Sequence, residues 1–136
     1  MTIADTAMDF FDACETGKGW EGCKQFCHPG ATFSAQAESL ADTTTLEGYT
    51  DWMKGFLVPC PNGRYELKAF SSDEARGIVS AFAVFHATHT VDGPVPATGK
   101  SVSAEYVYLM EFDGPKISHM TKVWNDVHSM RQIGWA

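Results

Sequence analysis

Apolar side chains in the first half of the chain recur every three or four residues, which is the spacing of one face of an α-helix. This period predicts a helix over residues 3–16 that begins after Thr2 and ends at Gly17. Asp5 lies three positions after Thr2, in the arrangement of a capping box. A short second helix is expected to follow, with its apolar side formed by Trp20, Cys23, Phe26 and Cys27.

A third helix is predicted after a short strand over residues 31–36. Thr44 and Glu47 have the spacing of a capping box, in which the two side chains satisfy each other's backbone N–H groups. Pro59 and Pro61 end this helix, because proline lacks the N–H that a helix interior needs. Its apolar stripe consists of Leu46, Tyr49, Met53, Phe56 and Leu57.

From Arg64 onward the period changes to two residues, which indicates strands whose side chains alternate between two faces. No linker or internal repeat divides residues 1–136, so one domain is expected. Helices followed by strands are typical of an α+β fold, here with the helices on one face of a bent antiparallel sheet. The predicted strands cover residues 65–70, 78–90, 101–112 and 116–125, and a short segment over 127–135 closes the chain.

The strand predicted over residues 78–90 is apolar on both faces, unlike a strand in a sheet with one face in water. The three helices cover only one of these faces, so we expect the other to pack against a second copy of the chain in a homodimer. The alternative is that the C-terminal segment or a loop covers it. One face holds Ile78, Phe82, Val84 and His86, and the other holds Val79, Ala81, Ala83, Phe85 and His89.

Charge and hydropathy exclude several classes of function. Ten lysines and arginines against 17 aspartates and glutamates give a formal net charge of −7. Because no basic cluster is present either, nucleic acids and anionic membranes are poor partners. No apolar run approaches the length of a transmembrane helix, and the acidic N-terminal residues do not resemble a secretory signal.

The four cysteines include no C-x-x-C pair, and the chain is long enough to be held together by core packing. Buried free thiols and a cytoplasmic location are therefore expected. Cys23 and Cys27 share one helical face with His28 beside them, but a metal site needs further ligands in a closed geometry. We expect neither a metal nor another cofactor. The spacing of glycines over residues 93–101 departs from that of a phosphate-binding loop, which excludes nucleotide hydrolysis and favours a hairpin connection.

Candidate chemistry lies on the last predicted strand. His119 and Asn125 share one face of it, with His119 as a candidate acid or base and Asn125 as a candidate amide donor to a carbonyl oxygen. The alternatives are that each histidine is a hydrogen-bonded structural side chain and that Asn125 and Asp126 cap the C-terminal segment. A pocket between helices and sheet would receive either this face or the opposite one, which holds Ser118, Met120, Lys122, Trp124 and Asp126.

The order helix, helix, strand, helix and four long strands resembles the nuclear transport factor-like superfamily. Within it, the chain resembles the SnoaL-like polyketide cyclase group over essentially its whole length. The resemblance implies a cone-shaped α+β barrel, with three N-terminal helices packed on one face of a strongly curved, mixed but mainly antiparallel sheet. The matching stretches are Thr88–Thr90, Pro96–Lys100, Phe112–Gly114 with Lys116–Ile117, Val123–Asn125 and Arg131–Gly134.

In characterised cyclases of this group, an aspartate near the end of the last strand acts as acid and base in an intramolecular aldol closure. The matching position is Asn125, whose amide has no proton to exchange at neutral pH. Asp126 is the next residue, and strand alternation sends it to the opposite face unless a bulge re-aims it. His119 or His89 is then the alternative source of the base, and the sequence does not choose between them.

Three functions remain compatible with the sequence. The first is a cofactor-independent enzyme, such as a cyclase, isomerase or dehydratase, that performs acid/base chemistry on a small apolar or amphipathic carbonyl compound. The second is a small-molecule binding module that uses the same cavity without proton transfer. The third is a dimeric interaction domain whose cavity is filled by its own side chains. The expected cavity residues are Phe11, Trp52, Met53, Phe56, Tyr106 and Trp124.

Overall fold

The computed structural model describes residues 1–136. The elements follow the order expected from the sequence, and the closing segment forms a fourth helix. The helices are α1 (Ile3–Glu15), α2 (Gly19–Cys23), α3 (Leu46–Phe56) and α4 (Asp126–Ile133), with short 3-10 turns at Lys24–Phe26 and Glu38–Leu40. The strands are β1 (Cys27–Ala35), β2 (Arg64–Asp73), β3 (Ile78–Thr88), β4 (Ser101–Asp113) and β5 (Lys116–Trp124).

The starts of α1 and α3 are set in different ways. At α1 the predicted capping box forms, with reciprocal N–H···O bonds of 3.1 Å between Thr2 and Asp5. At α3 the box predicted from Thr44 is wrong by one residue, because Thr45 is the N-cap and its hydroxyl accepts a first-turn N–H at 3.0 Å. The Thr44 carbonyl instead accepts from Phe33 of β1 at 2.9 Å, which keeps the chain extended up to Thr45.

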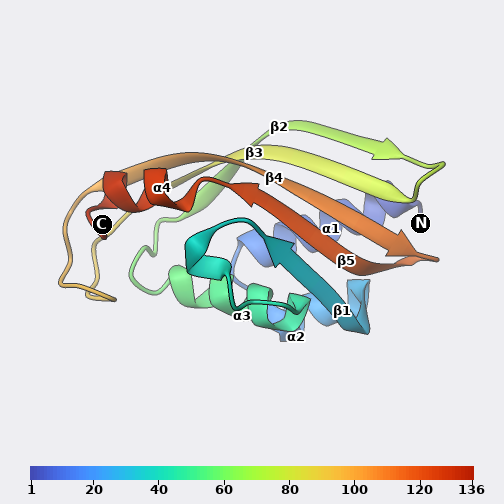
Figure 1. The fold of residues 1–136 in the computed structure, drawn as a ribbon, viewed down its shortest axis with the longest axis horizontal. Helices are drawn as coiled ribbons and strands as arrows, with labels where there is room; N and C mark the ends of the chain where they lie inside the picture. Colours follow the sequence, from blue (N-terminus) through green and yellow to red (C-terminus); the bar gives the residue numbers. More distant parts are fainter.

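The five strands form one sheet in the order β1-β5-β4-β3-β2. β1 pairs with β5 in parallel and the other three pairs are antiparallel, so the sheet is mixed. The long strands arch over α1, and both α2 and α3 lie on the same side of the sheet as α1 (Figure 1). The fourth helix, α4, lies at the end of the sheet where β5 finishes. This arrangement confirms the predicted α+β fold, with helices on one face of a strongly curved, mainly antiparallel sheet.

A bulge in β5 decides which of its side chains face the helices. Glu111 of β4 pairs with His119 and Phe112 pairs with Ile117, which leaves Ser118 as an extra residue in β5. Ile117 points into the core, but the extra residue reverses the alternation after it, so His119 faces outward. The side chains that face the helices beyond the bulge are Met120, Lys122 and Trp124.

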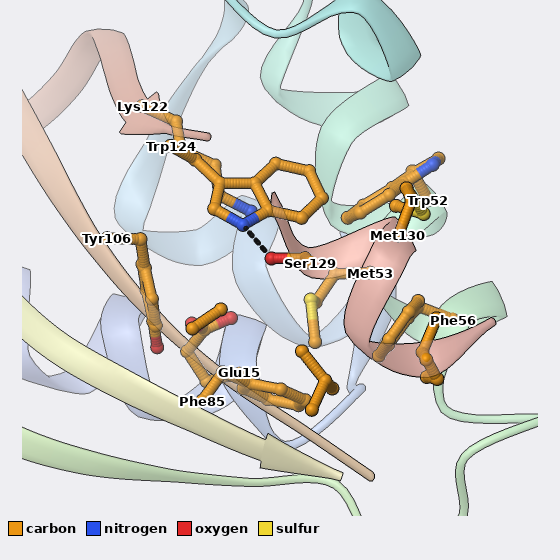
Figure 2. Close-up of a pocket in the computed structure, with 13 residues that line it drawn as sticks. Glu15, Trp52, Met53, Phe56, Phe85, Tyr106, Lys122, Trp124, Ser129 and Met130 are labelled. Carbon is orange, nitrogen blue, oxygen red and sulfur yellow. Dashed lines mark hydrogen bonds between the residues drawn. The ribbon is translucent and has the colours of Figure 1, made fainter. Parts of the chain in front are cut away.

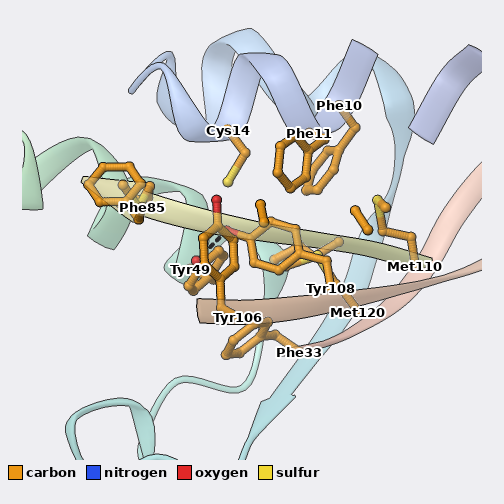
Figure 3. Packing of buried hydrophobic residues seen from close by; sticks show 14 of the residues in the cluster. Phe10, Phe11, Cys14, Phe33, Tyr49, Phe85, Tyr106, Tyr108, Met110 and Met120 are labelled. Atoms are coloured by element: carbon orange, nitrogen blue, oxygen red, sulfur yellow. Dashed lines mark hydrogen bonds between the residues drawn. The ribbon is translucent and has the colours of Figure 1, made fainter. Parts of the chain in front are cut away.

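The core lies between the helices and the concave face of the sheet (Figure 3). Aromatic rings fill much of it; Phe33 of β1, for example, stacks on Tyr49 of α3 with ring centroids 4.4 Å apart. The predicted division of β3 into two faces is confirmed, because Val79, Ala81, Ala83 and Phe85 are buried while the residues between them are only half-buried. No helix in the structure has the length and apolar character needed to cross a membrane.

Candidate functional site

A mainly apolar cavity lies between the concave face of the sheet, α3 and α4 (Figure 2). Its empty volume is about 460 Å³ when the open solvent at its mouth is included, and the space open to the centre of a water molecule is about 40 Å³. Ten of the 13 lining residues are hydrophobic, and the exceptions are Glu15 from the end of α1, Lys122 from β5 and Ser129 from α4. The remaining lining residues are Trp52, Met53, Phe56, Phe85, Val102, Ala104, Tyr106, Trp124, Met130 and Ile133.

Lys122 lies buried among aromatic rings, with only 6% of its surface exposed. Its Nζ is 4.1 Å from the ring centroid of Trp124, 5.0 Å from that of Tyr49 and 5.3 Å from that of Trp52. The faces of aromatic rings attract a cation, so this surrounding offsets part of the loss of water around the ammonium group. The bulge at Ser118 is what turns Lys122 toward these rings.

A chain of four hydrogen-bonded side chains, which we call the relay, connects Lys122 to Glu15. Lys122 Nζ donates to the hydroxyl of Tyr49 at 2.9 Å, the hydroxyls of Tyr49 and Tyr108 share a hydrogen bond, and the Tyr108 hydroxyl donates to Glu15 Oε2 at 2.9 Å. An ammonium group only donates and a carboxylate only accepts. With both ends charged, each tyrosine therefore accepts from the lysine side and donates toward the glutamate side.

Burial changes the acidity of both ends of the relay. It raises the pKa of the Glu15 carboxyl, an effect that the nearby charge of Lys122 and the tyrosine hydroxyls oppose. It also lowers the pKa of Lys122 to about 8, against the opposing influence of Glu15, Cys14 and Asp126. Burial thereby moves the pKa values of both groups toward neutral pH, where a side chain can exchange protons with a bound compound.

The cavity wall also holds hydrogen-bond donors that lack an acceptor. The buried hydroxyl of Tyr106 forms no hydrogen bond of standard geometry, although it lies close enough to the Glu15 carboxyl to lower the pKa of that carboxyl. Lys122 uses one of its three N–H groups in the bond to Tyr49. Unpartnered buried polar groups are rare in native proteins. Together these donors suit a ligand that presents an acceptor oxygen, such as a carbonyl, to the region between Tyr106 and Lys122.

Five of the six expected cavity residues lie on the wall, namely Trp52, Met53, Phe56, Tyr106 and Trp124. Phe11 does not line the cavity. It packs in the core with its ring centroid 4.9 Å from that of Tyr65 and 5.3 Å from that of Tyr108.

His119 and Asn125 do not lie on the cavity wall, so the expectation that they meet there is wrong. His119 is on the outer face of the sheet, with its ring nitrogens 2.7 Å from the hydroxyl of Thr32 and 3.0 Å from that of Ser34. The physical reason is the bulge at Ser118, which exchanges the two faces of β5 for all residues after it.

Asn125 and Asp126 both hold α4 in place, as the capping interpretation predicts. Asn125 is the N-cap of α4 and its side chain accepts from the backbone N–H of His128 at 3.2 Å. Asp126 accepts from the backbone N–H of Ser39 at 2.8 Å. Burial favours the neutral form of Asp126, but hydrogen bonds from Ser39 and neighbouring backbone groups outweigh it and lower the pKa of the carboxyl.

His89 is fully buried, but it lies outside the cavity wall, beside the β3–β4 connection. Its Nδ1 accepts from the indole Nε1–H of Trp135 at 2.9 Å and from the backbone N–H of Thr98 at 3.2 Å. Its Nε2 has no partner. The structure therefore gives His89 a part in joining the C-terminus to this connection.

Sequence reasoning missed the relay. The available signal was a charged residue within an apolar pattern: Lys122 stands between Met120 and Trp124 on one strand face, and Glu15 follows Phe11 by four residues on the apolar stripe of α1.

All four cysteines are buried free thiols. The structure has no group of three or more His, Cys, Asp or Glu side chains arranged to hold a metal ion.

Solved structures resemble the chain over nearly its whole length. IdmH from Streptomyces antibioticus, a candidate polyketide cyclase, has a TM-score of 0.80 at 17% identity, with 98% of this chain and 99% of IdmH covered. AclR from Streptomyces galilaeus, a candidate hydroxylase, has a TM-score of 0.78 at 18% identity, with coverages of 98% and 85%. An NTF2-like protein from Burkholderia thailandensis has a TM-score of 0.75 at 16% identity, with 97% of each chain covered. At these identities the likeness shows a shared fold.

No curated protein matches the sequence significantly. The model of the family described as SnoaL-like polyketide cyclase matches residues 5–133, which is nearly the whole chain. With the curved sheet, the helices on its concave face and the cavity between them, the chain belongs to the SnoaL-like polyketide cyclase family.

Proposed function

We propose that the protein is a cofactor-independent enzyme that performs acid/base chemistry on a small apolar carbonyl compound bound in the cavity. The observation that carries this proposal is the relay, because it places two ionisable groups with opposite charges in the wall of an otherwise apolar cavity. Sites with such shifted acid and base groups are typical of proton-transfer catalysis.

In this proposal Glu15 is the base and Lys122 stabilises the developing negative charge. Glu15 removes a proton from the carbon next to the carbonyl, and the electron pair of the broken C–H bond moves onto the carbonyl oxygen. Lys122 and the free hydroxyl of Tyr106 donate hydrogen bonds to that oxygen. Glu15 then returns the proton to another carbon in an isomerisation, or to the oxygen of a second carbonyl when the carbanion closes a ring.

The apolar wall supports this chemistry by excluding water. Trp52 and Phe56 of α3 and Met130 of α4 enclose the space in front of Lys122 and Glu15. In a dry cavity the attraction between the ammonium group and an enolate oxygen is much stronger than in water. The same side chains favour an apolar body in the ligand.

A non-catalytic binding module is the second candidate function. It is favoured by Asn125, which occupies the family's acid position and acts here as a helix cap. In that case Lys122 and Tyr106 only recognise an acceptor oxygen of the ligand. The third interpretation, an interaction domain with a filled cavity, is favoured by the small space, about 40 Å³, that is open to the centre of a water molecule in the cavity.

Turnover of a panel of β-keto esters, enones and epoxides tests the proposal. Glu15→Gln and Lys122→Met are expected to lower the rate by roughly 10²–10⁴-fold, the usual contribution of a positioned acid or base. His119→Ala is the matched control, since it alters an ionisable residue of β5 on the outer face and is expected to leave the rate unchanged. Rates that stay unchanged in the first two variants would remove the relay from the mechanism.

Ligand binding separates the enzyme from the binding module. Trp52 and Trp124 lie in the cavity wall, so their fluorescence is expected to change when a compound from the panel binds. A wild-type protein that binds these compounds and turns none of them over would support the binding module and contradict the proposed enzyme.

A further inference from the structure

We propose that Lys122 is also a nucleophile, and that its amine adds to the carbonyl carbon of an aldehyde or unhindered ketone in the cavity to form a protonated imine. This inference rests on the proposed function, because it assumes that a carbonyl compound occupies the cavity. It narrows the ligand class, since esters and hindered ketones do not readily form imines with an amine. It also assigns Lys122 a covalent bond to the ligand where the proposed function needs only a hydrogen bond.

The first supporting observation is the position of the Lys122 amine. It lies in the cavity wall and its only hydrogen bond is the one to Tyr49. It is in no direct ion pair, whereas the exposed residues Lys24 and Lys68 each contact a glutamate. A buried lysine without a directly bound carboxylate is the arrangement that favours the neutral, nucleophilic amine.

The second observation is the relay, which gives the departing proton a destination. A proton that leaves Lys122 passes to the Tyr49 hydroxyl, the proton of Tyr49 passes to Tyr108, and the proton of Tyr108 passes to Glu15. The transfer leaves a neutral amine and a neutral carboxyl, so no uncompensated charge remains in the interior. A nucleophile connected by hydrogen bonds to a base is the usual arrangement in covalent catalysis.

The atoms balance without any further reactant. The lone pair of the neutral amine forms a bond to the carbonyl carbon, and the π electrons of the carbonyl move onto its oxygen, which faces the free Tyr106 hydroxyl. The nitrogen passes a second proton to that oxygen, and the resulting hydroxyl leaves as water with the proton that Glu15 held. The sum is one ammonium group and one carbonyl giving one protonated imine and one water.

The acidity of Lys122 agrees with this geometry. With a pKa of about 8, it is neutral in about a tenth of the molecules at pH 7. An exposed lysine with an ordinary pKa near 10.4 is neutral in less than about a thousandth. Lys122 is therefore expected to react with a carbonyl compound faster than the lysines on the surface.

Reductive trapping tests the inference directly on the wild-type protein. The folded protein is incubated at pH 7 with benzaldehyde and sodium cyanoborohydride, which reduces an imine to a stable benzylamine, and the modified lysines are mapped by peptide mass spectrometry. Lys122 is expected to be modified at least about tenfold faster than the exposed Lys54 and Lys100. Modification confined to exposed lysines, with Lys122 unlabelled, would overturn the inference. This readout does not require any variant to fold.

Two variants test the part assigned to the relay. Tyr108→Phe interrupts the chain of hydroxyls and leaves the Glu15 charge in place, so it is expected to slow the labelling of Lys122 by about tenfold. Tyr65→Phe is the matched control, because it removes a tyrosine hydroxyl that bonds to Asp12 at 2.7 Å outside the relay. Labelling that is equally fast in Tyr108→Phe and Tyr65→Phe would overturn the role of the relay.

Trapping and turnover together distinguish this inference from the proposed function. Turnover of the carbonyl panel without any trapped adduct on Lys122 would overturn the inference and leave acid/base catalysis standing. A trapped adduct on Lys122 without turnover of the panel would support the covalent bond and contradict the proposed enzyme.

Discussion

Lys122 and Glu15 bring opposite charges into the protein interior. They are not in direct contact, and two hydrogen-bonded tyrosine hydroxyls connect them. Removing an ion from water costs several kcal/mol even after the protein relaxes, and the cost is offset only when partners and hydrogen bonds compensate it. The relay and the aromatic rings around Lys122 supply that compensation. The two charges are therefore expected to depend on each other for stability as well as for chemistry.

Glu15→Gln is expected to destabilise the protein by about 3 kcal/mol, because it leaves the Lys122 ammonium without a countercharge. The double variant Glu15→Gln/Lys122→Met is expected to be more stable than the sum of the single effects, since no unpaired charge remains. Urea unfolding followed by fluorescence measures both. Glu21→Gln is the control, because its bond to Lys24 is exposed and its loss is expected to have no measurable effect. Additive single effects would contradict the coupling.

The lowered pKa of Lys122 predicts a contribution to stability that grows with pH. Between about pH 8 and the ordinary lysine pKa near 10.4, the unfolded chain holds a proton on this residue that the folded protein has released. Since the unfolded state then binds more protons, the free energy of unfolding rises with pH in this window. The buried thiols with raised pKa values, such as Cys27, act in the opposite direction in the same range, so the wild-type curve alone does not isolate Lys122.

The test compares the free energy of unfolding of the wild type and of Lys122→Met from pH 7 to 10. The difference is expected to shift in favour of the wild type above about pH 8, because only the wild type carries the Lys122 contribution. Burial lowers this pKa, and Glu15, Cys14 and Asp126 on neighbouring elements oppose the lowering. A difference that stays constant over the range would show that Lys122 titrates like an exposed lysine.

At the level of elements, the sequence predicts which helices and strands form better than it predicts where they face. The apolar periods locate α1, α3 and the long strands, because burial of one stripe or face leaves a regular pattern. The bulge at Ser118 leaves no such mark, yet it decides that Lys122 and not His119 reaches the cavity. The N-cap of α3 is Thr45 and not the predicted Thr44, because hydrogen bonding of Thr44 to β1 outweighs the local capping pattern.

The residues of the candidate site were likewise predicted only in part from the sequence. The stripe of α3 predicts Met53 and Phe56 as cavity residues, because an apolar face that does not fill the core tends to line a cavity. The sequence marks Glu15 and Lys122 as charged residues on apolar faces but does not predict that the relay connects them, since Tyr108 and Glu15 are 93 positions apart. Hydrogen bonds over such distances depend on the packing of elements, which a periodic pattern does not encode.

The N-cap of α4 gives a prediction at this scale. Asn125→Ala removes the acceptor for the backbone N–H of His128 and is expected to cost about 1 kcal/mol of stability. Because α4 contributes Ser129 and Met130 to the cavity wall, the same variant is expected to weaken ligand binding. Asn125→Asp is the control, since aspartate also caps helices and interacts well with the helix dipole. Thermal unfolding and fluorescence titration measure the two effects, and equal behaviour of both variants would remove the cap from the explanation.

For the whole molecule, the outer face of the sheet is the surface that the helices leave uncovered. On β3 its positions, including Phe82 and Val84, are half-buried, and Val123 of β5 is 56% exposed. A hollow on this face is lined by Phe82, Glu105, Val107 and Val123 among others, so side chains of a second molecule have space to pack there. These features favour the homodimer expected from the apolar pattern of β3.

Light scattering at micromolar concentration is expected to give the mass of a dimer for the wild-type protein. Val123→Glu places a charge within the proposed contact, so it is expected to shift the protein to a monomer without unfolding it. Val58→Glu is the matched control, because Val58 is 65% exposed beyond the end of α3, on the helical side of the sheet, and the variant is expected to remain dimeric. A monomeric wild type would contradict the dimer and leave the cavity chemistry untouched.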